Sequence, residues 1–188
     1  METKKQKILK ISKKLGLSHI GSCLSVLPVL DEIYSNKKDG DFVLMDNAHA
    51  HLAHLLFTNP KHIEEMIEKY GIHCDRRAGC DANGGSLGHA GGIAIGLALA
   101  NKDKNVHVIF SDGSIQEGSN WEALRIIETL KLKNIKCYFS INGYTALEKI
   151  DTSELSERIV QWFPSAKIRF TNNSRNYDGV KGHYIKAI

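Results

Sequence analysis

The stretch FSDGSIQEGSNWEALRIIETLKLKNIKCYFSINGY, residues 110–144, joins the end of one apolar run to a second apolar run through a helical pattern. Asp112 follows the first run, and Asn142 follows the second run thirty residues later. Two strands joined by a helix of this length form a right-handed crossover, in which the strands are parallel. The stretch therefore predicts two parallel strands, each with a polar residue at its carboxyl end.

The same alternation of strands and helices continues on both sides of this stretch. Strands are predicted at residues 41–45, 105–110, 135–141 and 167–171, and helices at 2–15, 25–34, from about 48, 59–71, 89–102, 115–131 and 153–163. Asn59 is expected to cap the fourth helix, with Pro60 in its first turn and Gly71 at its end. The polar residues 72–88 predict a long loop, a kind of segment that is usually functional or disordered. The fold class is therefore α/β, with a parallel sheet flanked by helices and a helical N-terminal half around it.

Length and composition favour one domain, residues 1–188, because 188 residues with 42% hydrophobic side chains suffice for one core and not comfortably for two. The lysines near the N-terminus alternate with Ile8, Leu9, Ile11 and Leu15 at helical spacing, which favours an amphipathic helix over a nucleic-acid-binding arm. No apolar run approaches 18 residues and the first residues lack a signal-peptide pattern. We therefore expect a cytoplasmic protein with neither a membrane nor a nucleic acid as partner.

The residue types at the two strand ends indicate a cation site. In open parallel sheets, ligands bind beyond the carboxyl ends of the strands, where Asp112 and Asn142 are expected. Carboxylate, amide and main-chain carbonyl oxygens are hard ligands that suit Mg²⁺, which usually completes its coordination with phosphate and water. Gly113 allows a close approach of the backbone, and a helix beginning near Ser114 would direct its positive end at a phosphate. Asp-Gly and Asn-Gly are also common turn sequences, so each of them alone is more often a turn.

The order Asp-Gly, EG, EA, LKL and Asn in this stretch resembles the thiamine diphosphate motif of transketolases, with Ser111 where that family usually has the first glycine. The resemblance implies a thiamine diphosphate-binding fold that holds the coenzyme together with Mg²⁺. It assigns the metal to Asp112, Asn142 and the main-chain carbonyl of Tyr144, and the diphosphate to Gly113. Glu117 matches the family's interface glutamate, which couples to a cofactor-activating glutamate of the partner.

Further stretches resemble the family in the same order along the chain. LSHIGSCLS implies that His19 contacts the substrate, DFVLMDNAHAHLAHLL implies that His49 reaches the coenzyme, and YGIHC implies that His73 lines the substrate channel. In GGSLGHAGG, the backbone of Gly85, Ser86 and Leu87 would hold the aminopyrimidine. The end VKGHYIKAI resembles the Trp-His-Tyr end of short transketolase subunits, with Gly182 in place of Trp and His183 as a candidate catalytic residue.

The implied activity is transfer of a two-carbon ketol unit between sugars or sugar phosphates. In the family, the glutamate that activates the coenzyme lies on a pyrimidine-binding domain, and residues 143–188 are too few to form it. We therefore expect the N-terminal subunit of a split enzyme, paired with a C-terminal subunit in a hetero-oligomer such as a dimer of heterodimers. Two alternatives stay open: a non-catalytic cofactor-binding or regulatory subunit, and an unrelated binder of phosphosugars or nucleotides.

Nine histidines and four cysteines also raise the question of zinc. The segments HAHLAH (His49, His51, His54) and HCDRRAGC (His73, Cys74, Cys80) are the candidate clusters. A structural zinc site needs four ligands in recognisable pairs, which neither segment supplies alone. We therefore favour ordinary structural roles for His51, His54, His62 and His107, and leave His89 open. The cysteines follow no disulfide spacing and are expected to be reduced, buried packing residues. The loop residues Asp75, Arg76 and Arg77 suit either a sugar phosphate or a solvated surface.

Overall fold

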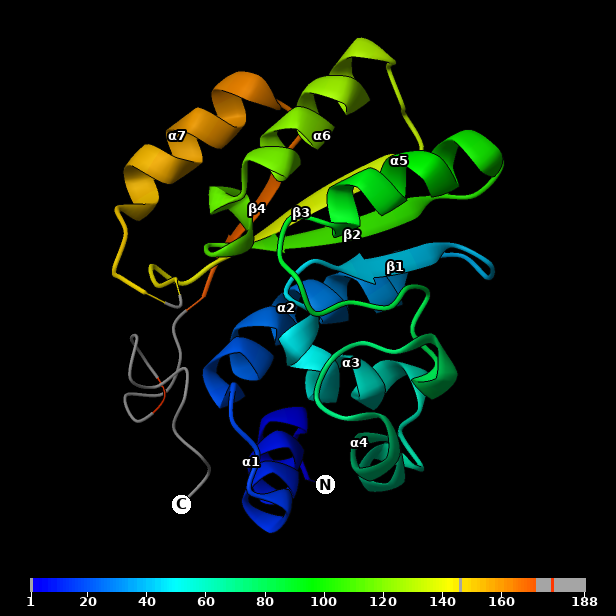
Figure 1. Ribbon diagram of the computed structural model, residues 1–188, viewed down its shortest axis with the longest axis vertical. Helices are drawn as coiled ribbons and strands as arrows, with labels where there is room; N and C mark the ends of the chain where they lie inside the picture. The colour runs from blue at the N-terminus through cyan, green and yellow to red at the C-terminus, as the bar shows by residue number, and fades with distance from the viewer. Residues whose placement is uncertain (1, 146, 172–176, 178–188) are drawn as a thin grey trace.

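The computed structural model describes residues 2–145, 147–171 and 177. Its centre is a four-stranded parallel sheet in the order β1-β2-β3-β4, so that strands next to each other in the sequence are neighbours in the sheet (Figure 1). The strands are β1 (Phe42–Met45), β2 (Val106–Ser111), β3 (Ile135–Ile141) and β4 (Lys167–Phe170). Ser111 pairs with Ser140, and β2 and β3 therefore end almost level with each other.

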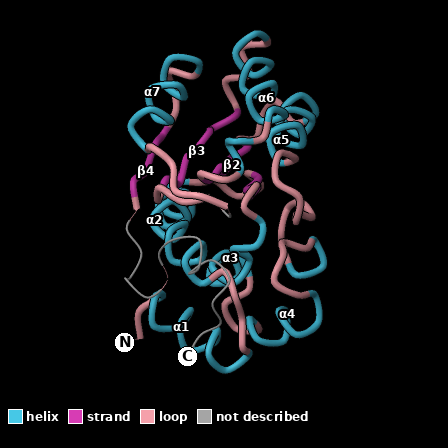
Figure 2. Tube along the Cα trace, turned by 60° about the vertical axis from the view of Figure 1, so that its left-hand side comes forward, coloured by secondary structure: helices cyan, strands magenta, loops and turns pink. Residues whose placement is uncertain are grey.

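Helices cover both faces of the sheet (Figures 1 and 2). The helices α5 (Ala90–Ala100), α6 (Gly118–Thr129) and α7 (Thr152–Trp162) lie on one face. The helix α2 (Ile20–Asn36) lies on the other face, with α1 (Lys4–Leu15), α3 (His51–Thr58) and α4 (Ile63–Tyr70) around it. Short 3₁₀ turns are η1 (Ala48–Ala50), η2 (Arg76–Ala78) and η3 (Ser114–Gln116). The predicted α/β architecture is confirmed.

The two central strands, β2 and β3, are largely apolar because each face packs on its own cluster of buried side chains. In β2, Val106, Val108 and Phe110 belong to the cluster formed with α5, α6 and α7. Ile109 belongs to the second cluster, formed with the N-terminal helices, as does Tyr138 of β3. A strand buried on both faces is expected to be largely apolar, and from Val106 to Phe110 only the buried His107 departs from this in β2.

Three helix boundaries differ from the prediction. The second helix begins at Ile20 rather than 25, because the buried Ile20, Cys23 and Leu24 offset the weak helix preference of the glycine and serine between them. The prediction that Asn59 caps a helix is wrong: Asn59 ends α3, its carbonyl accepts a hydrogen bond from the N–H of His62, and α4 begins at Ile63.

The helix predicted at 115–131 is in fact the turn η3 followed by α6, which begins at Gly118. Ser114 therefore begins a short turn and not an α-helix. The partial positive charge expected from a helix N-terminus at this point is weaker as a result. Within the described residues, no helix combines the length and the apolar character needed to cross a membrane.

Candidate active site

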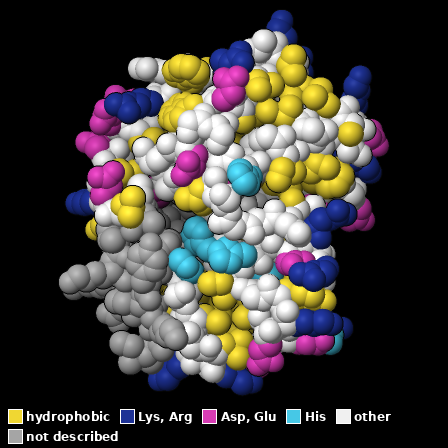
Figure 3. Space-filling view, viewed as in Figure 1, with side chains coloured by type: hydrophobic (Ala, Val, Ile, Leu, Met, Phe, Trp, Pro, Cys, Tyr) yellow, Lys and Arg dark blue, Asp and Glu magenta, His cyan; other side chains and the backbone are white. Residues whose placement is uncertain are grey.

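A cleft lies at the carboxyl ends of β2 and β3, where the topology of a parallel sheet places ligands. Residues from α2, from the segment after β1 and from the loops after β2 and β3 line it. Six of the residues singled out in the sequence line this cleft: His49, Leu87, Asp112, Gly113, Asn142 and Tyr144. Histidine side chains gather in the middle of the face that Figure 3 shows. The fold thus brings into one place residues that are up to 95 positions apart, from His49 to Tyr144.

Asp112 lies at the base of this cleft and is almost fully buried, with 1% of its surface exposed. Its Oδ2 accepts a hydrogen bond from the main-chain N–H of Asn142 at 2.8 Å, and its Oδ1 accepts one from Gly143 at 2.9 Å. Burial raises the pKa of Asp112 to about 6, although these two hydrogen bonds act in the opposite direction. A cation beside the carboxylate would favour its charged form, so the burial of this group suits a metal ligand.

The amide of Asn142 is held in a fixed orientation. Its Nδ2 donates to the hydroxyl of Ser25 at 3.0 Å, and its Oδ1 accepts from the main-chain N–H of Tyr144 at 3.0 Å. An ionised carboxylate has about four acceptor positions, of which Asp112 uses two for these main-chain donors, and an amide oxygen has two. The pair therefore retains oxygen lone pairs for a hard cation, which is the donor set that Mg²⁺ prefers.

Ser111 and Gly113 flank the carboxylate. Neither has a positive φ, so the position where the family usually has its first glycine does not require one here. The hydroxyl of Ser111 instead accepts the N–H of Ser114 at 3.4 Å. A Cβ atom added to Gly113 would lie 3.6 Å from Leu87, an ordinary contact. Gly113 and Leu87 are therefore neighbours across the cleft.

His19 and His49 form a pair at the side of the cleft. Their ring centroids lie 4.8 Å apart, and Nε2 of His49 lies 3.1 Å from the hydroxyl of Ser22. His19 has φ 60° and ψ 26°, a left-handed conformation that histidine adopts more readily than most residues and that is enriched at functional sites. Two imidazoles at this distance can donate hydrogen bonds to a bound ligand and hold protons near neutral pH.

Asp46, which the sequence analysis did not single out, holds the segment 85–90 in place. This buried carboxylate accepts hydrogen bonds from the main chain of Gly88 and Ala90 and from the side chain of Asn120, each at 2.8 Å. Its position directly after β1 is the same strand-end signal that drew attention to Asp112. β1 is shorter than β2, however, and the sequence analysis assigned the function of this segment to the nearby His49.

Asn47 was also missed. It lines the cleft beside His49, and its Oδ1 is buried without a hydrogen-bond partner among the described residues. A buried acceptor without a donor costs free energy, about 1–3 kcal/mol, unless a ligand supplies the donor. Asn47 is therefore a further candidate ligand contact.

Five of the described residues predicted for the site do not line the cleft: His19, His73, Gly85, Ser86 and Glu117. His73 is exposed and lies next to Gly85, since a Cβ added to Gly85 would lie 3.7 Å from its ring. Ser86 lines a small neighbouring cavity with Asp46. Glu117 is exposed at the start of α6. His183 lies outside the described residues.

The amino-acid sequence is similar to those of several known proteins. The chain is 38% identical over 96 residues to a putative uncharacterized transketolase family protein of Sinorhizobium fredii. It is 36% identical over 161 residues to the 1-deoxy-D-xylulose-5-phosphate synthase of Fusobacterium nucleatum, and 28% identical over 162 residues to a 6-deoxy-6-sulfo-D-fructose transketolase subunit, SqwG, of a Clostridium species. These matches cover 44%, 79% and 70% of this chain. No protein-family model matches the chain.

The fold is found in solved transketolases. The structure of the Campylobacter jejuni enzyme covers 99% of this chain with a TM-score of 0.74 and 16% identity, while the chain covers 40% of that enzyme. The chain likewise spans 34%, 26% and 59% of the three relatives, in the order given above.

The fold and the cleft define an α/β protein with a polar ligand site at the carboxyl ends of its parallel strands. The sequence matches name transketolase-family proteins and the solved neighbours are transketolases, so the chain resembles the transketolase family, as its motifs indicated.

Proposed function

We propose that the chain is the diphosphate-binding subunit of a split transketolase-like enzyme, which transfers a two-carbon ketol unit between sugars or sugar phosphates. The observation that carries this proposal is the hydrogen-bonded pair of Asp112 and Asn142 in the cleft. In the proposed complex, both side chains and the main-chain carbonyl of Tyr144 hold Mg²⁺, and Gly113 contacts the diphosphate of thiamine diphosphate. When bound, this coenzyme supplies a carbon nucleophile and an electron sink for cleavage of a carbon–carbon bond.

The chain's own residues position the reactants and hold protons. Gly85, Ser86 and Leu87 approach the coenzyme's pyrimidine side through their backbone, and Asp46 fixes the segment that carries them. Asn47 offers its unpaired oxygen to a donor of the coenzyme or the substrate. His19 and His49 donate hydrogen bonds to sugar hydroxyls and to an oxygen on which negative charge develops, and His73 serves the same purpose at the entrance.

A partner subunit completes the proposed site. Thiamine diphosphate activation needs a carboxylic acid at the pyrimidine, and in this proposal it comes from the partner's pyrimidine-binding domain. The exposed position of Glu117 suits contact with that partner. The similarity to SqwG, which is itself named a transketolase subunit, supports the two-chain arrangement. The proposed assembly is a hetero-oligomer such as a dimer of heterodimers.

Calorimetric titration of the chain with thiamine diphosphate in the presence of Mg²⁺ tests the site. We expect binding that needs the metal and that weakens by about 10- to 100-fold in Asp112→Asn, because the variant loses one charge-assisted metal contact. Asp103→Asn, an exposed aspartate in the turn before β2, is the matched control. Wild-type affinity in a folded Asp112→Asn protein would contradict the proposal.

Turnover is then tested with the product of an adjacent gene that encodes a pyrimidine-binding domain. We expect ketose cleavage only when both chains, the coenzyme and Mg²⁺ are present. Turnover by the isolated chain would refute the split arrangement. Coenzyme binding without turnover in the mixture would leave a non-catalytic cofactor-binding subunit as the function.

The 36% identity to the Fusobacterium nucleatum synthase favours a second candidate, formation of 1-deoxy-D-xylulose 5-phosphate by the same cleft. Mass spectrometry of the products of the reconstituted enzyme separates the candidates, because a deoxy sugar phosphate has one oxygen fewer than the corresponding ketose phosphate.

A further inference from the structure

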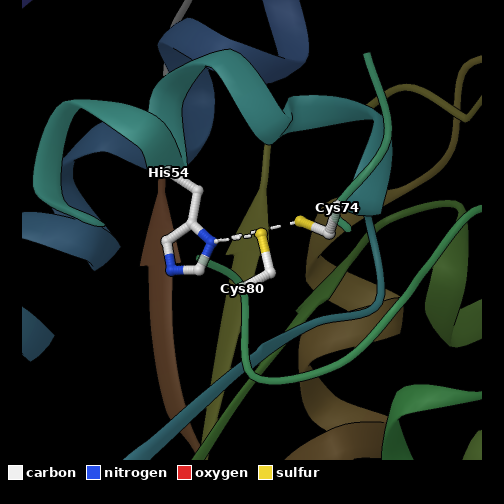
Figure 4. Close-up of side chains that lie close together, drawn as sticks. All are labelled: His54, Cys74 and Cys80. Carbon is white, nitrogen blue, oxygen red and sulfur yellow. Dashed lines mark hydrogen bonds between the residues drawn. The ribbon is translucent and has the colours of Figure 1, made fainter. Parts of the chain in front are cut away.

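A second cluster of chemically active side chains lies between α3 and the loop 71–89. Nδ1 of His54 lies 3.5 Å from the sulfur of Cys80 and 4.0 Å from the sulfur of Cys74. Figure 4 shows both sulfur atoms directed towards the same ring nitrogen. The three ligand atoms all lie within 4.8 Å of one another, and the three side chains are buried. None of them lines the cleft described above.

We propose that His54, Cys74 and Cys80 bind a zinc ion, and that His51, which lies outside this group of three, moves towards the metal to become the fourth ligand. In a tetrahedral site, Zn–S bonds of ~2.3 Å and Zn–N bonds of ~2.0 Å separate a sulfur from a nitrogen by about 3.6 Å. The two observed separations, 3.5 and 4.0 Å, lie on either side of this value. Two thiolates and two imidazoles form a common donor set of structural zinc sites.

The environment of His51 supports its inclusion. Its Nδ1 lies 3.2 Å from the carbonyl oxygen of Gly71, which can only accept, so Nδ1 carries the proton and Nε2 has a free lone pair. Nε2 is fully buried and has no hydrogen-bond partner among the described residues. His51 lies on α3 three residues before His54, one turn away along the same helix. A cation at the cluster would satisfy this otherwise unpaired acceptor.

The ring nitrogen of His54 that faces away from the cysteines has a hydrogen-bond partner, as metal-binding histidines usually do. Nε2 of His54 lies 2.8 Å from the hydroxyl of Tyr34, on the side of the ring opposite the sulfur atoms. If Nε2 donates to this hydroxyl, the lone pair of Nδ1 points at the cysteines. Such a contact fixes the tautomer and the ring orientation of a ligating histidine.

The position of the site indicates a structural role. The loop 71–89 crosses from α4 to α5 and carries His73 and the segment Gly85–Leu87, which borders the cleft. Its regular structure is limited to the short turn η2. One main-chain hydrogen bond, from Cys74 N to Ala48 O at 3.0 Å, joins it to η1, and another, from Gly84 N to Cys74 O at 2.9 Å, lies within the loop. Four protein ligands would close the site to substrate and fasten this loop to α3.

Metal analysis of the purified chain tests the proposal directly. We expect about one zinc per chain after purification under reducing conditions, and, after exchange with Co²⁺, the absorption bands of tetrahedral cobalt together with thiolate-to-cobalt charge transfer. These readouts do not depend on coenzyme binding or turnover, so the proposal can fail while the proposed function stands. A wild-type chain that retains no zinc and gives no thiolate–cobalt absorption would overturn the site, and it would leave a thiol–imidazole hydrogen-bond cluster instead.

Variants test the ligand assignment. Cys74→Ser and Cys80→Ser should each lose the thiolate–cobalt signal and most of the zinc, whereas Cys137→Ala, which removes a buried thiol from the other core, should keep both. His51→Gln should weaken zinc binding by at least ~10-fold, and the exposed His62→Gln should not. Unchanged zinc affinity in His51→Gln would remove His51 from the site.

The effect on the loop supplies a measurement that needs no variant. Removal of the metal from the wild-type chain with a chelator should speed amide hydrogen exchange across residues 72–88 by at least ~10-fold. Exchange in β2 and β3 should change little. Equal exchange of the loop with and without the metal would contradict a fastening role.

Discussion

Asp112 and Asn142, thirty residues apart in the sequence, are joined directly: Oδ2 of Asp112 accepts the main-chain N–H of Asn142 at 2.8 Å. The two side chains that would share a cation are thus held together by the fold itself. The hydroxyl of Ser25, on α2, orients the amide of Asn142 from the other side at 3.0 Å. The geometry of the candidate ligand pair therefore depends on a helix that precedes the sheet in the sequence.

Replacement of Ser25 by alanine should weaken Mg²⁺-dependent binding of thiamine diphosphate by about 10-fold, because the amide of Asn142 loses the contact that orients it. Ser35→Ala, on the exposed end of the same helix, is the control and should bind like the wild type. Isothermal titration calorimetry measures both. Equal affinities of the two variants would show that Ser25 does not position the amide.

Replacement of Asp46 by alanine should lower the free energy of unfolding by about 3 kcal/mol or more. The substitution leaves the main-chain donors of Gly88 and Ala90 and the amide of Asn120 without their acceptor in a buried position. Urea denaturation measures the change. Asp46→Asn, with one acceptor oxygen, should lose less, and the exposed Asp103→Ala should change stability by less than ~0.5 kcal/mol. A loss in Asp46→Ala as small as that of Asp103→Ala would disprove the anchoring role.

Gly88→Ala should destabilise the chain by about 2 kcal/mol. Gly88 has φ 89°, which costs a non-glycine residue ~1 kcal/mol or more, and an added Cβ would collide with Ser119 and Glu117. The matched control is Gly92→Ala within α5, where an added Cβ meets no atom within 4 Å. This control should be neutral or stabilise the helix by ~0.5–1 kcal/mol. Thermal unfolding of both variants gives the comparison, and a Gly88→Ala protein as stable as Gly92→Ala would contradict it.

The stability of the chain should depend on Asp41 at acid pH. Burial alone would raise the pKa of Asp41, but hydrogen bonds from Lys38 and Asn105 lower it to about 2. A folded pKa below the unfolded value of 3.8 means that ionised Asp41 stabilises the fold above pH ~4, by about 2 kcal/mol, and that this stability is lost as the pH falls towards 2.

Urea denaturation of Asp41→Asn beside the wild type measures this contribution. The advantage of the wild type should shrink by ~1 kcal/mol between pH 6 and pH 3, since about half of the contribution is lost over that interval. Asp103→Asn should show no such change. A difference between Asp41→Asn and the wild type that is the same at both pH values would refute the prediction.

Most of the fold could be predicted because its strands are short apolar runs with polar residues on either side. The predicted strand 135–141 matches β3, since both faces of this run are buried. The helix near Asn59 was misplaced because an Asn-Pro pair is as suitable for a turn between helices as for a cap. Local sequence cannot decide between these two uses.

The cleft could be predicted in part. Parallel strands bring their carboxyl ends to one edge, so Asp112 and Asn142 could be placed together from the sequence alone. The zinc ligands could not, because they come from two segments that only tertiary packing brings together. Each segment supplies one half of a ligand set, His51 with His54 and Cys74 with Cys80. Their burial was expected, but the contact between a cysteine and an imidazole was not.

The pairing of Ser111 with Ser140 makes β2 and β3 end beside each other. This register limits where residues can be inserted into the chain or deleted from it. An insertion in the turn at residues 131–134 leaves this register intact, because a longer connection adds only a small entropic cost. A deletion of one residue within β3 instead turns every following side chain to the opposite face. Such a deletion would direct Asn142 away from Asp112, so an insertion in the turn at residues 131–134 should be far better tolerated than a deletion inside β3.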